Sequence, residues 1–120
     1  QNLKYDFERW LLSGLHEAGV QLLLGTDSGA GNMGIVPGFS IHDELRILVE
    51  NGFTPYEALL TGTVNAARVV QKMTGKGNYE TIEAGNRADL ILVNGNPLED
   101  LTVIKEPLGV MAAGRWYSEV

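Results

Sequence analysis

The sequence predicts an α/β fold, and three observations lead to that prediction. An amphipathic stretch at residues 3–18 runs into a short, nearly continuous apolar segment at residues 20–24, which is typical of a strand buried on both faces of a parallel sheet. Helical periodicity returns over residues 40–74, and from about residue 76 the pattern becomes that of strands. The expected order is therefore helix, strand, loop, three helices and three strands, with a boundary between residues 75 and 85.

Composition narrows the function classes. With 120 residues, 44% hydrophobic and 20% charged, the chain suits one small globular domain and is too short for most enzymes built on large barrels. Its net charge of −6 argues against nucleic acid or an anionic membrane surface as a partner. No apolar stretch approaches the ~20 residues that a membrane span requires. The absence of cysteine excludes disulfides and thiolate metal sites.

The beginning of the chain suggests that more sequence precedes it. The first residue is Gln1 rather than methionine, and no signal peptide is visible. The apolar segment at residues 20–24 also needs parallel neighbours that this chain does not supply. We therefore expect the natural N-terminus to lie upstream. The compartment stays unknown, although the lack of a visible signal favours the cytoplasm, and a homo-oligomer is compatible with the sequence.

Helix boundaries carry local signals. Thr54, Pro55 and Glu57 form the strongest one, because threonine can cap, proline suits the first helical position and glutamate completes a capping box. Ser40 and Asp43 give a similar start for the preceding helix. The expected helix ends are Gly19, Asn51-Gly52 and Gly75.

Strand signals fill the last third of the chain. Residues 88–93 predict a strand, and Asn94-Gly95 after it is a tight-turn signal. Residues 108–111 and 115–117 flank Ala113-Gly114, which predicts a hairpin.

The candidate for chemistry is Asp27, which follows the apolar segment directly within the sequence Gly-Thr-Asp-Ser-Gly at residues 25–29. In parallel α/β proteins the carboxyl ends of strands are where ligands bind. A carboxylate there could bind a divalent cation or act as a general base toward a metal-bound water. The alternative is that Asp27 caps the turn that follows it.

An overlapping glycine pattern suggests a different function. Gly29, Gly31 and Gly34 match the spacing of a dinucleotide-binding loop. That function needs a helix that begins inside the pattern, so that its amides meet the pyrophosphate. A helix starting at Gly31 would support it, and one starting at Ser40 would reject it.

The two histidines have competing interpretations. His16 is expected on the solvent side of the first helix. His42 lies in the first turn of the second helix, as a half-buried residue that bonds a neighbouring backbone group or as a substrate or metal contact. No His-x-His or His-Glu-x-x-His pattern exists, so recognisable spacing gives no complete metal site. Ser28 lacks the Gly-x-Ser-x-Gly context of a nucleophilic serine.

Several blocks, in order, resemble the amidohydrolase superfamily, most closely its imidazolonepropionase-like and prolidase-like members. They are residues 25–29, 42–45, 52–59 with 63–67, and 82–90. The first block is similar to the end of the eighth barrel strand, where the family holds a metal-site aspartate.

This resemblance implies the C-terminal part of a (β/α)8 TIM barrel at residues 1–75, with the last strand and its flanking helices. Residues 76–120 would then be strands of a small β-sandwich domain. The resemblance further implies a divalent metal, commonly zinc, and hydrolysis of a C–N bond in a small amide, cyclic amide or dipeptide. Asp27 would be a metal-site residue and would pass a proton from water to the leaving nitrogen. His42 and Ser28 would be substrate contacts.

Other metal ligands of the family are absent from this sequence, namely its His-x-His pair, its bridging lysine and its two later histidines. We therefore expect the 120-residue chain alone to lack hydrolase activity and to bind zinc weakly or not at all. The remaining possibility from another class is a non-catalytic or truncated α/β module that folds by oligomerising.

Overall fold

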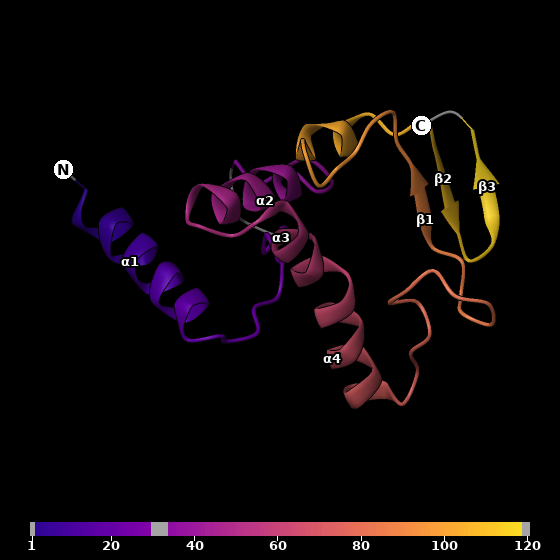
Figure 1. Ribbon diagram of the computed structural model, residues 1–120, viewed down its shortest axis with the longest axis horizontal. Helices are drawn as coiled ribbons and strands as arrows, with labels where there is room; N and C mark the ends of the chain where they lie inside the picture. Colours follow the sequence, from indigo (N-terminus) through magenta and orange to yellow (C-terminus); the bar gives the residue numbers. More distant parts are fainter. Residues whose placement is uncertain (1, 30–33, 119–120) are drawn as a thin grey trace.

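The computed structural model describes residues 2–29 and 34–118, and in this part of the chain the α-helices precede a small sheet (Figure 1). The helices are α1 (Leu3–Glu17), α2 (Ser40–Glu50), α3 (Pro55–Gly62), α4 (Val64–Thr74) and the 3-10 helix η1 (Leu101–Lys105). The strands are β1 (Leu90–Leu92), β2 (Gly109–Ala112) and β3 (Arg115–Tyr117). The predicted mixture of helices and strands is therefore confirmed.

The predicted strand at residues 20–24 is wrong as a regular strand. A parallel strand needs neighbouring strands to satisfy its backbone groups, and the sheet of the described residues contains only β1, β2 and β3. Two backbone groups of this segment bond helical residues instead. The Leu24 N–H donates to the Thr61 carbonyl at 3.1 Å, and the Asn65 side-chain amide donates to the Leu22 carbonyl at 3.2 Å.

The capping box predicted for α3 is confirmed. The Thr54 hydroxyl accepts from the Glu57 N–H at 3.2 Å, and the Glu57 carboxylate accepts from the Thr54 N–H at 2.8 Å. The box predicted for α2 is wrong. Ser40 is the first helical residue rather than the cap, and its hydroxyl accepts from the Val36 N–H at 2.9 Å.

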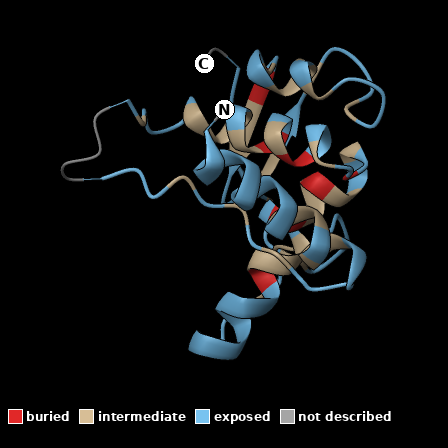
Figure 2. Cartoon of the chain, turned by 90° about the vertical axis from the view of Figure 1, so that its left-hand side faces the viewer, coloured by how far each residue is buried: buried red, intermediate tan, exposed pale blue. Residues whose placement is uncertain are grey.

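The buried core lies between α2 and α3. Leu45, Leu48, Phe53 and Ala58 form it, with Leu12, Leu22, Leu24, Leu101 and Ile104 packed against it. Figure 2 marks the buried positions in red, and α1 has none. Apolar side chains of α1 are exposed, Leu3 and Trp10 most strongly, at 83% and 70%. No described helix is both long and apolar enough to span a bilayer.

The sheet is antiparallel in the order β1-β2-β3. The predicted hairpin between β2 and β3 is confirmed, and both residues of its turn are left-handed, with φ of 49° at Ala113 and 81° at Gly114. That combination is the one that matches strand twist in a two-residue hairpin. The chain does not turn straight back at Asn94-Gly95, because η1 lies between β1 and β2.

Candidate functional site

Asp27 lies in the loop that follows residues 20–24 and leads toward α2. Its backbone is left-handed, with φ of 50°, a conformation that aspartate tolerates better than most residues. The side chain is exposed, as is that of Ser28 beside it. The two residues therefore stand together at the surface, beyond the point where the preceding segment is tied to the helices.

The segment before Asp27 has one face toward the protein. Leu22 and Leu24 are half-buried against the core, while Gln21 and Leu23 are exposed. The alternation is that of an extended chain, whose successive side chains point in opposite directions. Asp27 thus follows a segment with a defined inner face, although that segment has no partner strand in the described sheet.

His42 is half-buried, as one interpretation of the sequence predicted. It lines a cavity of about 260 Å³ between α2 and η1. Other residues around this cavity include Leu45, Arg46, Leu101 and Thr102. The His42 Nδ1 atom is buried and has no hydrogen-bond partner among the described residues, so it does not make the expected bond to a backbone group there. The role of His42 and Ser28 as substrate contacts stays a prediction.

A divalent cation would find one suitable donor in Asp27, because carboxylate oxygen is an ordinary ligand for zinc and for harder cations. A catalytic zinc site needs about three protein ligands. Within residues 2–29 and 34–118, no group of three or more histidine, cysteine, aspartate or glutamate side chains could hold a metal ion. The chemistry of Asp27 fits a metal site, and the described part of this chain does not complete one.

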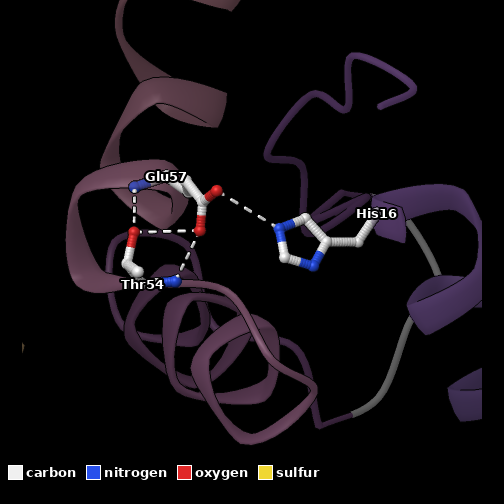
Figure 3. Close-up of polar contacts among 3 residues, drawn as sticks. All are labelled: His16, Thr54 and Glu57. Carbon is white, nitrogen blue, oxygen red and sulfur yellow. Dashed lines mark hydrogen bonds and ion pairs between the residues drawn. The ribbon is translucent and has the colours of Figure 1, made fainter. Parts of the chain in front are cut away.

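His16 is not on the solvent side of α1, so that prediction is wrong. Its ring stacks on Phe53 with centroids 3.9 Å apart and planes inclined by 22°. Its Nε2 lies 3.4 Å from the Glu57 carboxylate (Figure 3). Leu12, one helical turn earlier, packs against the same core. The spacing of Leu12 and His16 on one helix face was the available signal.

Glu57 joins this contact to the cap of α3. Hydrogen bonds from the Thr54 N–H and then from the Thr54 hydroxyl lower the pKa of Glu57, and His16 lowers it further. The carboxylate therefore stays ionised to lower pH than an ordinary glutamate. The sequence predicts the Thr54–Glu57 pair but gives no sign of His16 as its third member.

The dinucleotide alternative is wrong. Helix α2 begins at Ser40, well beyond Gly34, so its N-terminal amides cannot serve a phosphate held by the glycine pattern. Gly31 lies outside the described residues.

Known proteins resemble this chain over most of its length. The pattern of the amidohydrolase family matches residues 8–117. Ochratoxinase from Aspergillus niger is 38% identical over 101 residues, which are 81% of this chain and 18% of that enzyme. A Xaa-Pro dipeptidase structure with methionine in its active site has a TM-score of 0.74 and 31% identity, covering 92% of this chain and 25% of that one. The structure of molinate hydrolase has a TM-score of 0.70 and 27% identity, covering 88% of this chain and 25% of that one.

Proposed function

Because this chain belongs to the amidohydrolase family, we propose that it forms the C-terminal part of a metal-dependent hydrolase that cleaves carbon–nitrogen bonds. We refer to that longer hydrolase as the parent enzyme. The observation that carries the proposal is the family match over residues 8–117, which includes Asp27 and the residues around it. The chain spans 18% of ochratoxinase and about a quarter of the dipeptidase, so the complete active site is a property of the parent enzyme.

In this proposal residues 1–75 close a (β/α)8 barrel and residues 76–120 contribute strands to a small β-sandwich domain. Residues 20–24 would gain in the barrel the neighbouring strands that the described sheet does not provide. Their nearly continuous apolar sequence supports this, because strands of a barrel are covered on both faces.

Asp27 is the proposed metal-site residue and proton carrier. A divalent cation, most commonly zinc in this family, would supply the acidity that makes water a nucleophile near neutral pH. The Asp27 carboxylate would accept the proton of the attacking water and return it to the leaving nitrogen. This role suits a side chain that is exposed at the end of a tethered segment.

The proposed substrates are small amides, cyclic amides or dipeptides. A dipeptidase and ochratoxinase are both among the relatives of this chain. His42 and Ser28 are the proposed substrate contacts of this chain, with Ser28 next to Asp27 and His42 on the cavity beside η1.

The direct test is Asp27→Asn in the parent enzyme, assayed on a panel of dipeptides and N-acyl amino acids. Asparagine keeps the size and tolerates the left-handed backbone, so the variant removes only the ionisable carboxylate. We expect kcat to fall by about 10²-fold or more, and chelation to abolish activity until metal is restored. Asp43→Asn, an exposed change on α2, is the matched control. Wild-type kcat in the Asp27 variant would overturn the proposal.

The 120-residue chain alone provides a second test. We predict that it has no hydrolase activity and binds zinc weakly or not at all, because its described residues offer no cluster of three ligands. Calorimetric titration of the chain with zinc measures this. A stoichiometric site with sub-micromolar affinity would contradict the assignment of the other ligands to the rest of the parent enzyme.

A further inference from the structure

The segment before Asp27 is tied to the junction of α3 and α4 at two backbone groups. The Leu22 carbonyl accepts from the Asn65 amide, and the Leu24 N–H donates to the Thr61 carbonyl. Both bonds are made by residues of the segment whose side chains pack on the core. Both bonds lie within a few residues of Asp27, so they fix the position of the backbone that leads to Asp27.

The junction between α3 and α4 leaves a backbone carbonyl available to this segment. Helix α3 ends at Gly62 and α4 begins at Val64, with Thr63 between them at φ −117° and ψ −94°. A carbonyl in the last turn of a helix has no partner within that helix, which leaves the Thr61 carbonyl able to accept from Leu24. Thr61 itself is only 2% exposed, and its hydroxyl donates to the Ala58 carbonyl at 2.6 Å.

Gly62 allows the close approach. A Cβ atom at this position would lie 2.8 Å from Leu24 Cδ2 and 3.5 Å from Leu24 Cβ. Only the 2.8 Å distance is shorter than van der Waals contact, so a larger residue at position 62 would displace the terminal methyl group of Leu24. The segment is thus held by two hydrogen bonds and by direct packing on a bare backbone.

We propose that Asn65 is a positioning residue for Asp27, acting through residues 22–24. This inference rests on the proposed function, in which the Asp27 carboxylate must meet ligands supplied by the rest of the parent enzyme. Asn65 is the side chain that reaches from the helices to the Leu22 backbone, across 43 positions of sequence. A misplacement of about 1 Å in a catalytic group can cost about 10²-fold in rate. The loss of this one hydrogen bond can therefore affect the rate more than its own bond energy suggests.

The structural test measures amide exchange in the parent enzyme. Asn65→Leu keeps a similar volume and removes the donor, so the Leu24 amide should exchange about tenfold faster. The amide of Ala58, which bonds Thr54 inside the α3 cap, should stay at its wild-type rate. Asn51→Leu is the matched control, since it removes a comparable side-chain bond to the Ile47 carbonyl at the C-terminal end of α2. Unchanged exchange at Leu24 in Asn65→Leu would overturn the inference.

The kinetic test separates positioning from general stability. We expect Asn65→Leu to lower kcat by about tenfold or more with KM nearly unchanged, and Asn65→Gln, which keeps the amide donor, to recover part of the loss. Asn51→Leu should leave kcat at the wild-type value. Equal losses of kcat in Asn65→Leu and Asn51→Leu would show a purely structural effect and contradict the inference.

Gly62→Ala is a second variant that does not touch Asn65. It should also lower kcat, because its Cβ displaces Leu24, whereas Gly14→Ala on α1 meets nothing within 4 Å and should not.

Asp27→Asn keeps the two proposals apart. If that change leaves activity intact, the proposed function fails; if it abolishes activity while Asn65→Leu and Gly62→Ala keep kcat, only the positioning inference fails.

Discussion

The Nε2 atom of His16 lies 3.4 Å from the Oε1 atom of Glu57, and this contact links α1 to the first turn of α3. The His16 ring stacks on Phe53 in the core at the same time. Helix α1 buries no residue of its own, so this pair of contacts and the packing of Leu12 hold its C-terminal end.

Loss of the His16 ring should therefore loosen α1. We predict that His16→Ala costs about 0.5–1.5 kcal/mol from the lost aromatic stack. The amides of the last turns of α1 should exchange faster in deuterated solvent. His16→Phe keeps a ring over Phe53 without the contact to Glu57, so it should recover most of the protection. If His16→Ala leaves exchange in α1 unchanged, the stack does not anchor the helix.

The capping box of α3 should contribute strongly to the stability of that helix. Thr54→Ala removes the hydroxyl that accepts from the Glu57 N–H, and we expect the free energy of unfolding to fall by about 0.5–2 kcal/mol. Urea denaturation followed by circular dichroism measures it. Thr63→Ala, at the other end of α3, removes a hydroxyl that donates to the Leu59 carbonyl in an exposed hydrogen bond, and it should change stability much less. Equal losses in the two variants would contradict the assignment.

Glu57 should also give stability a dependence on acid pH. Its pKa in the folded protein lies below the ordinary value of 4.5, chiefly because the Thr54 N–H donates to it. A carboxyl with a lowered pKa stabilises the folded state fully above its unfolded pKa, and the contribution is lost as pH falls through the folded pKa.

The expected result is a loss of stability on acidification below about pH 4.5 that is smaller in Glu57→Gln than in the wild type. Unfolding curves measured between neutral pH and pH 3 provide the comparison. Glu17→Gln, which removes another glutamate at the end of α1, is the control. Parallel pH profiles for wild type and Glu57→Gln would sink this prediction.

The hairpin turn contains a correctable strain. Ala113 adopts φ of 49°, which costs an ordinary residue about 1–2 kcal/mol. Ala113→Asn creates the residue pair preferred in such turns, so we expect a gain of about 0.5–1 kcal/mol and a higher melting temperature. Ala84→Asn, at a position without a positive φ, should not stabilise. A melting temperature that does not rise in Ala113→Asn would contradict the strain argument.

Local signals in the sequence predicted local structure well. Thr54, Pro55 and Glu57 lie next to one another in the chain, so the cap depends on no distant partner, and it forms as expected. Ala113-Gly114 behaves in the same way. Ser40 is the counterexample, because a nearby competitor, the Val36 N–H, occupies its hydroxyl.

Features that depend on distant residues were missed. The prediction for His16 is wrong because its partners, Phe53 before α3 and Glu57 in α3, are distant in the sequence. The strand predicted at residues 20–24 is absent, and Thr61 and Asn65 bond two of the backbone groups of that segment. The position of Asp27 after an apolar run and the resemblance to the amidohydrolases both indicate it as a site residue. Its role stays a prediction, because the ligands that would complete a metal site are not among the described residues.

The edge position of β1 affects how the 120-residue chain behaves by itself in solution. In the described sheet it has β2 on one side only, and Ile91 and Leu92 are half exposed. An edge of this kind is a template on which another copy can add its own strand, and such additions can continue into insoluble polymers. We therefore expect the separate chain to aggregate more as its concentration rises, and Ile91→Lys should reduce this aggregation.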